Sequence, residues 1–369
     1  MTATARTSVL VTGAGGPLGV NLTRSLNRAP TPLRIIGTDA NRYHLPLSLA
    51  DTTYLIPPAK HRAAYLRALD SVVEDESVDV IVPTHPLEVR TIAELVEEGA
   101  LHSVGIALPR ASILQIADDK AATQRALAAA GVPVPRTLLL RDERALETAF
   151  NELTGADDRV WVRGSGAPGL GVGGAALPCR SASVARAWIE FHDGWGRMAA
   201  SEYLPGANLS WMGAFDRGTL IAAGARERLE YVLPHVSPSG ITGAPAVSRT
   251  ISRRDVAVTS ERAVRAIDDV PHGAYFVDLK EDSRGQALVT EINAGRCGTT
   301  IEAYTHAGYN FPWLLVQLAR GERVDPLANP NAAIEPDLYW VRTLDCGPVV
   351  GKGDNGFDQY PRAGRIEGP

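Results

Sequence analysis

Short apolar runs alternate along the chain with longer amphipathic segments, a pattern typical of proteins that mix strands and helices. Near the N-terminus, runs at residues 8–12, 33–38 and 78–83 predict three strands. The segments 21–26 and 91–98 predict helices that follow the first and third of them. Strands that alternate with helices in this way favour βαβ units and a parallel sheet.

The middle of the chain opens with a long helical pattern. Residues 113–130 are rich in alanine and other apolar residues, and Gly131 followed by prolines ends the pattern, so we expect one helix here. Further strands are predicted at residues 137–140, 159–163, 198–204, 210–215, 219–223, 275–279 and 287–293, and further helices at 143–153, 184–191, 255–267 and 312–319. A last strand is predicted at 339–341, before a tail rich in glycine and proline.

The strands at 275–279 and 287–293 carry acidic and amide side chains at alternate positions. A short Asp-Ser-Arg-Gly turn between them predicts an antiparallel hairpin. Side chains two residues apart on a strand share a face, so Glu291 and Asn293 point the same way and Asp278 can join them. Two carboxylates and an amide oxygen form a hard oxygen site that suits Mg²⁺. A solvated polar face of the hairpin is the structural alternative.

Composition narrows the class of protein. A length of 369 residues indicates several packed lobes, and a formal charge of −5 argues against a nucleic-acid partner. No apolar run approaches the roughly 18 residues that a membrane helix needs, and no leader pattern precedes the first strand. The 3 cysteines lie far apart, so we expect a reducing, cytoplasmic location. Only 4 of the 37 basic residues are lysine, and the rest are arginine.

A glycine-rich turn follows the first strand. Gly13, Gly16 and Gly19 have the spacing of a short-chain dehydrogenase, and Asp39 ends the next strand where a ribose-binding acid sits in dinucleotide folds. An NAD(P)-dependent oxidoreductase is therefore an alternative function. However, no tyrosine in the sequence has a lysine four residues later, so the catalytic Tyr-x-x-x-Lys of those dehydrogenases is missing. A tight turn that only starts a Rossmann-like lobe explains the same glycines.

The hairpin resembles a known family. Glu291-Ile-Asn293 resembles the E-x-N metal strand of ATP-grasp enzymes, and Asp278 resembles their other acidic position. In that family these three side chains hold the magnesium ions (manganese is an alternative) that bridge the phosphates of ATP. Many relatives have an arginine two residues after the asparagine. Here Arg296 follows Asn293 by three residues, and the resemblance assigns it a catalytic role at the transferred phosphate.

Other segments resemble ATP-grasp motifs in the family's order. The resemblance assigns Lys120 and Arg163 to the ATP phosphates, although relatives usually have a second lysine at the place of Arg163. It assigns Glu202, Tyr203 and Leu204 to the hinge that receives adenine. It also implies roles for Gly169 and Gly171 in a glycine-rich phosphate loop, for Asn208 in place of a ribose-binding glutamate, and for Arg228 as a cation for a phosphate or a substrate carboxylate.

The resemblance is to the carbamoyl-phosphate-synthetase-like branch and extends over about residues 8–320. It implies an α/β and α+β protein in which a Rossmann-like lobe precedes a two-lobed ATP-grasp fold. The expected parts are a pre-ATP-grasp domain at 1–110, an N-terminal and lid subdomain at 111–205, a metal and substrate subdomain at 206–325 and a C-terminal extension at 326–369.

The implied activity is ATP-dependent ligation of a small-molecule carboxylate to an amine through an acyl phosphate, and family habit allows a homodimer. The alternatives are another ATP-grasp outcome such as carboxylation, the oxidoreductase, and a nucleotide-binding protein with reduced catalysis.

Overall fold

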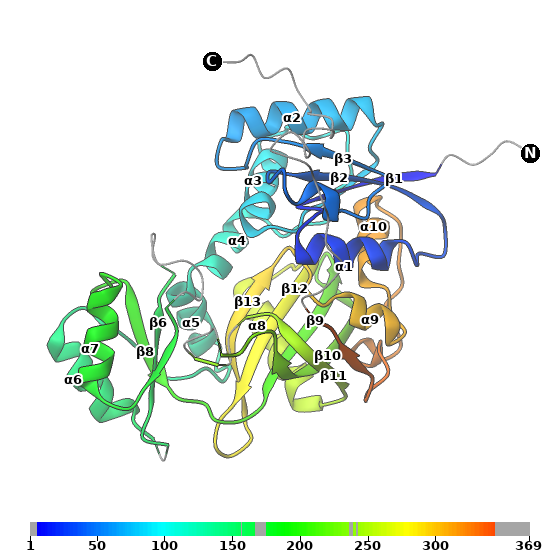
Figure 1. The fold of residues 1–369 in the computed structure, drawn as a ribbon. Helices are drawn as coiled ribbons and strands as arrows, with labels where there is room; N and C mark the ends of the chain where they lie inside the picture. The colour runs from blue at the N-terminus through cyan, green and yellow to red at the C-terminus, as the bar shows by residue number, and fades with distance from the viewer. Residues whose placement is uncertain (1–5, 156, 167–174, 236–238, 241–242, 344–369) are drawn as a thin grey trace, which may run out of the picture.

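Three β-sheets organise the chain in the computed structural model, which describes residues 6–155, 157–166, 175–235, 239–240 and 243–343. Figure 1 shows a blue and cyan N-terminal lobe above a broad yellow and lime sheet, with a smaller green lobe to the side. No helix in these described ranges is both long and apolar enough to cross a membrane.

The N-terminal lobe is a parallel sheet with helices on both faces. Its strands run in the order β3-β2-β1-β4, and every neighbouring pair is parallel. They are β1 (Thr7–Thr12), β2 (Leu33–Asp39), β3 (Thr52–Leu55) and β4 (Val80–Val82), and the helices are α1 (Pro17–Leu26), α2 (Arg62–Asp75) and α3 (Pro86–Glu97). Alternate residues of β1 pack to opposite sides: Leu10 packs with α2 and α3, and Val9 with α1. The predicted parallel sheet is confirmed, whereas β3 and α2 were not predicted.

A six-stranded antiparallel sheet forms the centre of the molecule, in the order β13-β12-β9-β10-β11-β14. Its strands are β9 (Asn208–Asp216), β10 (Thr219–Tyr231), β11 (Pro245–Ile251), β12 (Gly273–Glu281), β13 (Ala287–Ala294) and β14 (Tyr339–Val341). The predicted hairpins at β9–β10 and β12–β13 are both present. β14, in the segment expected as a C-terminal extension, pairs with β11 and lengthens this sheet.

Helices cover both faces of the central sheet. One face packs against α4 (Ala111–Asp118), α5 (Lys120–Ala129) and α8 (Arg254–Ile267). The opposite face packs against α9 (Glu302–His306) and α10 (Phe311–Ala319), and the same core cluster includes α1 and β1 of the N-terminal lobe. The N-terminal lobe and the central sheet therefore share one continuous apolar core. The short 3₁₀ turns are η1 (Leu45–Leu47) and η2 (Pro330–Ala332).

The smaller lobe is a four-stranded antiparallel sheet in the order β5-β8-β6-β7. Its elements are β5 (Thr137–Leu139), α6 (Glu143–Leu153), β6 (Val160–Gly164), β7 (Leu177–Cys179), α7 (Ala182–Phe191) and β8 (Met198–Glu202). The lobe has its own core around Leu146, Val162 and Ile189, and its chain returns to the central sheet from β8 into β9.

The single helix expected at residues 113–130 is wrong, because two helices occupy this segment. Asp119 separates α4 from α5 with an extended backbone, at φ −88° and ψ 101°. Its carboxylate accepts hydrogen bonds from the amides of Ala121 and Ala122, at 2.9 and 3.0 Å. A side chain that caps the orphan amides of a helix stabilises a new start at that point. The break makes Lys120 the first residue of α5.

Two glycines, one at the start of β12 and one in the turn after it, provide a matched test of how tightly the central sheet is packed. Gly273 and Gly285 have similar left-handed backbones, with φ of 84° and 79°. A methyl group on Gly273 would lie 2.5 Å from the carbonyl oxygen of Ala107, whereas one on Gly285 would meet nothing within 4 Å.

We expect Gly285→Ala to lower the free energy of unfolding by about 1 kcal/mol through backbone strain alone. Gly273→Ala should cost about 1–3 kcal/mol more, because backbone atoms must move. Urea unfolding of the two variants measures the difference. Equal losses of unfolding free energy in the two variants would show that the backbone around Ala107 moves away from a methyl group on Gly273 without an energetic cost.

Candidate functional site

The β12–β13 hairpin brings the predicted carboxylates together. Asp278 lies directly opposite Glu291 in the antiparallel ladder, and Asn293 lies two residues further along β13. The alternate residues Val277 and Leu279 are buried against the helices on the other face of the sheet. Pairing and alternation therefore place the two carboxylates and the amide on one face, as the sequence predicted.

Each of these three side chains already contacts a cation. The Lys120 ammonium lies 3.6 Å from the Glu291 carboxylate. Arg228 forms a close ion pair with Asp278, and Arg296 donates a hydrogen bond to the amide oxygen of Asn293. These cations come from α5, from β10 and from the loop after β13, so three separate parts of the chain converge on the hairpin.

Lys120 is held in an environment that opposes its charge. Its side chain is 8% exposed, and burial lowers the pKa of its ammonium, with a further lowering from the nearby Arg163. Glu291 acts in the opposite direction and raises the pKa. A desolvated lysine beside a second cation is a typical feature of a site that receives an anion.

Arg163 reaches the site from the smaller lobe. It stands on β6, and its guanidinium donates to the backbone carbonyl of Thr290 on β13, over 3.3 Å. Burial lowers the pKa of Arg163 and the Glu291 carboxylate raises it, which places the two groups in mutual range. The smaller lobe thus contributes a cation to the edge strand β13 of the central sheet, in electrostatic range of Glu291.

Asp118 joins the site although the sequence gave it no role. It ends α4, and its carboxylate lies 3.4 Å from Arg90. Burial raises the pKa of Asp118, while Arg90 and Arg296 lower it and Glu291 raises it further. The sequence analysis did not select Asp118, because it expected one continuous helix over residues 113–130. Asp118 is instead the last residue of α4.

The oxygen donors of the site fit Mg²⁺ in the presence of a phosphate ligand. Burial raises the pKa of Asp278, and the adjacent Arg228 lowers it. Within the described parts of the chain, no group of three or more His, Cys, Asp or Glu side chains could hold a metal ion. Two carboxylates and an amide are too few donors for an all-protein cage, but they suit Mg²⁺ that is shared with phosphates and water.

A cavity of about 450 Å³ opens beside these cations. It lies between α5 and the strands of the smaller lobe, and its polar lining includes Lys120, Gln124, Thr137 and Arg163. Its volume is in the range of small-molecule sites. Both cationic side chains that the sequence assigned to phosphates therefore border one hollow.

The hinge predicted at Glu202, Tyr203 and Leu204 lies at the end of β8, and two of its side chains form hydrogen bonds within the protein. The Glu202 carboxylate accepts a hydrogen bond from the backbone amide of Arg136, at 3.0 Å. The hydroxyl of Tyr203 accepts one from Arg159, at 3.2 Å, and Leu204 is buried. Asn208, predicted as a ribose contact, accepts a hydrogen bond from Lys280. Gly169 and Gly171 lie outside the described residues.

The carboxylate of Asp39, beside the N-terminal glycine turn, accepts hydrogen bonds from backbone amides of the protein itself. One Asp39 oxygen accepts a hydrogen bond from the amide of Asn41 at 2.9 Å, and the other accepts from Gly15 at 3.2 Å. Asp39 is 5% exposed, and a methyl group on Gly15 would lie 1.9 Å from the carbonyl oxygen of His44. The carboxylate that would read a ribose in a dinucleotide fold is thus occupied by the turn itself, which argues against the oxidoreductase.

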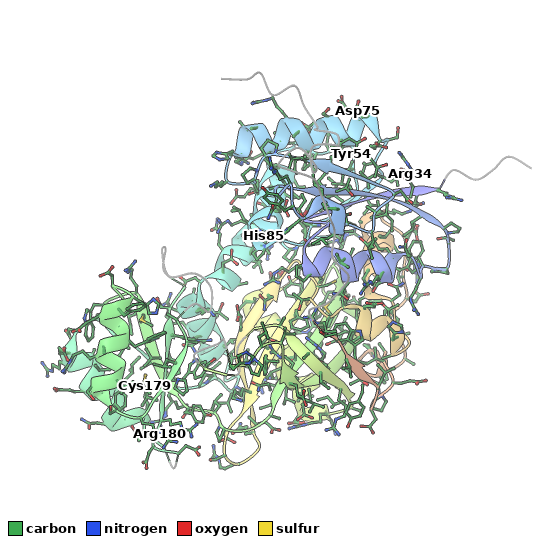
Figure 2. The ribbon with its side chains drawn as sticks, in the orientation of Figure 1. Arg34, Tyr54, Asp75, His85, Cys179 and Arg180 are labelled. Atoms are coloured by element: carbon green, nitrogen blue, oxygen red, sulfur yellow. The ribbon has the colours of Figure 1, made fainter. Side chains whose placement is uncertain are left out.

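The N-terminal lobe nevertheless borders the site. His85 caps α3, and its Nδ1 accepts a hydrogen bond from the amide of Leu87 at 3.2 Å. Figure 2 shows His85 at the end of this lobe that faces the rest of the molecule. Burial lowers the pKa of His85, and the positive charge of Arg296 lowers it further.

Solved structures share the fold of this protein over most of the chain. Biotin carboxylase from Campylobacter jejuni matches with a TM-score of 0.65 and 17% identity, over 91% of this chain and 74% of that one. N5-carboxyaminoimidazole synthetase from Staphylococcus aureus matches with a TM-score of 0.61 and 16% identity, over 87% and 79%. L-amino acid ligase from Bacillus licheniformis matches with a TM-score of 0.59 and 14% identity, over 86% and 75%.

No protein-family model matches the sequence, and a search of curated proteins found no match. The structural matches confirm the predicted fold class: a parallel N-terminal lobe followed by an ATP-grasp fold with two antiparallel sheets.

Because the ammonium of Lys120 is buried, we expect its removal to raise the free energy of unfolding. We expect Lys120→Met to raise the free energy of unfolding of the ligand-free protein by about 1 kcal/mol at pH 7, because a desolvated charge disappears. The gain should shrink as the pH rises. The folded wild type has the lower lysine pKa, so its unfolded state binds more protons and its stability increases with pH.

Urea unfolding at several pH values measures this effect, and Lys60→Met at an exposed lysine is the matched control. A Lys120→Met protein that is less stable than wild type at every pH would show that the ion pair with Glu291 outweighs the burial of the charge.

Proposed function

We propose that the protein is an ATP-dependent ligase that activates a small-molecule carboxylate as an acyl phosphate and joins it to an amine, with release of ADP. One observation carries the proposal. Asp278 and Glu291 face each other on the central sheet, with Asn293 beside them and with cations from both ATP-grasp lobes around them. Alternating carboxylates and cations suit a ligand made of phosphates and Mg²⁺.

Acidic and amide side chains would bind the metal ion, and basic side chains would bind phosphate and carboxylate oxygens. Asp278, Glu291 and Asn293 would hold Mg²⁺, which supplies charge neutralisation to the phosphates when it is bound. Lys120 and Arg163 would bind phosphate oxygens from the sides of the two lobes, because both border the same cavity. Arg296 and Arg228 would release their contacts with Asn293 and Asp278 to meet the transferred phosphate and the substrate carboxylate. Positioning and neutralisation are what phosphoryl transfer demands of a protein.

Carboxylation is the second outcome that this site supports. The solved structures with the same fold include a biotin carboxylase and an N5-carboxyaminoimidazole synthetase as well as an L-amino acid ligase. Ligation would activate a carboxylate with ATP and carboxylation would activate bicarbonate with ATP, so the acidic face alone does not separate them. The second reactant does: ADP release with an acid and an amine supports ligation, and ADP release with bicarbonate supports carboxylation.

We expect Glu291→Gln to lower ADP release at least 100-fold while leaving the fold intact. The amide keeps the shape of the side chain but removes the negative charge that Mg²⁺ and Lys120 require. A coupled assay of ADP release measures the loss, after acid–amine pairs have been screened with the wild type. Glu230→Gln, at an exposed carboxylate of β10, is the matched control. Normal turnover in Glu291→Gln would overturn the assignment of the metal site.

Ligand-dependent melting separates the ATP-grasp function from the oxidoreductase. A ligand at about 100 times its Kd stabilises the native state by about 2.7 kcal/mol, which raises the melting temperature by a few degrees. We expect this shift with ATP and Mg²⁺, its loss in Glu291→Gln, and no shift with NADH or NADPH. A shift with NADH or NADPH alone would move the function to the glycine turn of the N-terminal lobe.

A further inference from the structure

The cavity between α5 and the smaller lobe extends beyond the two cations that the proposed function uses. Its volume is about 450 Å³. On one side it is lined by a face of α5 that carries polar and small residues, namely Lys120, Ala121, Gln124, Arg125 and Ala128. Leu127 of the same helix packs instead into the core of the central sheet. The polar face of α5 is therefore the wall of a hollow and makes no contact with that core.

The smaller lobe provides the opposite wall. Leu139 on β5, Ala199 on β8 and Arg163 on β6 lie directly opposite one another in the antiparallel ladders, so their side chains share a face. All three line the cavity. Their neighbours Val162 and Ala200 point the other way, into the core that α6 and α7 cover. The face that carries Arg163 therefore looks into the cavity.

Charge of only one sign lines this cavity. Among the described residues its lining includes the cations Lys120, Arg125, Arg136 and Arg163, and no aspartate or glutamate. Lys120 is 8% exposed, and its Nζ, 3.6 Å from Glu291, has no hydrogen-bond partner in the described part of the chain. A cleft lined by one sign of charge concentrates counter-ions, and a buried donor without a partner gains from an acceptor. The cavity is therefore suited to an anion.

Two of these cations stand apart from those assigned to the nucleotide. Arg125 lies five residues beyond Lys120 on α5, which is about 7.5 Å further along the helix axis. Arg136 precedes β5, and its Nε donates to the Glu202 carboxylate over 3.4 Å. Neither arginine belongs to the β12–β13 hairpin, and the ATP-grasp resemblance gives neither of them a role. They form a second basic end of the cavity, whose charge the nucleotide does not explain.

The lining also selects the class of anion. Guanidinium groups bind carboxylates and phosphates through paired hydrogen bonds. Apolar side chains border the same hollow, among them Ala128, Val134 and Leu139. A volume of about 450 Å³ is in the range of small-molecule sites. The matching ligand is a small molecule whose two or more anionic groups are joined by a short chain.

We propose that Arg125 and Arg136 form the outer part of a second anion site, which binds a small molecule with two or more carboxylate or phosphate groups and competes with the nucleotide phosphates for Lys120 and Arg163. The anion site follows from the cavity and its charges alone, whereas the competition also rests on the proposed use of ATP. Through the shared cations, a bound polyanion lowers the affinity for ATP, so the site is inhibitory.

Direct titration of the full chain tests the anion site without nucleotide or Mg²⁺. The probes are citrate and pyrophosphate, with acetate as the monovalent control, and calorimetry at constant ionic strength gives their Kd values. Wild type should bind at least one polyanion more tightly than acetate. Arg125→Gln should raise the Kd of that polyanion about fivefold or more, as expected for the loss of a charge-assisted hydrogen bond. Arg125→Lys should recover part of the affinity, because it keeps the charge.

Arg28→Gln, at an exposed arginine of the N-terminal lobe, is the matched control and should bind as wild type does. Arg125 is also exposed, and a melting temperature near that of wild type shows that Arg125→Gln is folded. If wild type binds neither polyanion, or if Arg125→Gln and Arg28→Gln both keep the wild-type Kd, the anion site is overturned.

A second titration tests the competition. With free Mg²⁺ held constant, the polyanion should raise the apparent Kd of wild type for Mg·ATP, and Arg125→Gln should reduce this effect while its own Kd for Mg·ATP alone stays unchanged. An unaltered Kd for Mg·ATP at saturating polyanion overturns the competition. If wild type binds no Mg·ATP at all, the proposed function fails, whereas the direct titration still decides the anion site.

Discussion

The pairing register of the β12–β13 hairpin determines which face of the central sheet carries the carboxylates Asp278 and Glu291. Asp278 faces the same side of the sheet as Asn293 only because it pairs with Glu291, and a shift of one residue would turn either carboxylate to the apolar side packed by α8. The apolar alternation of Val277 and Leu279 fixes this register from the opposite face. The central β9 strand then holds β12 in place, with Ser210 opposite Asp278. Burial of one face thus specifies the polar geometry of the other.

The site holds more positive charge than its carboxylates neutralise. Lys120, Arg163 and Arg296 all have a pKa lowered by burial, and Glu291 acts against this in each case. Desolvated cations oppose the stability of the empty protein and strengthen the binding of an anion, because the ligand supplies the missing charge. Cations from the smaller lobe and from the central part of the chain meet beside Glu291 on the edge strand β13.

The glycine turn of the N-terminal lobe has the spacing of a dinucleotide-binding motif, but its contacts do not favour that function. The turn with Gly13, Gly16 and Gly19 has the spacing of a dinucleotide site, and its strand, turn and helix are present as expected. Yet Asp39 is buried against the amides of its own turn, and the lobe shares its core with the central sheet. The spacing of the glycines therefore does not by itself assign a dinucleotide to this turn.

Local pattern was sufficient to predict most strands and helices, the parallel N-terminal sheet and the acidic β12–β13 hairpin. Alternation and turn residues act over a few positions, so Asp278, Glu291 and Asn293 could be placed on one face before any packing was known. The break at Asp119 was missed, because a run of helix-forming residues hides a cap that depends on tertiary context.

The sequence pattern could not predict which acidic or amide side chain each cation contacts. Arg228 meets Asp278 across 50 positions of the chain, and Lys280 meets Asn208 across 72. Such contacts are set by strand order and lobe packing, which bring distant segments to a few ångströms. Residue types and spacing therefore indicated which acidic and amide side chains share a face, whereas long-range packing determined which cation each of them meets.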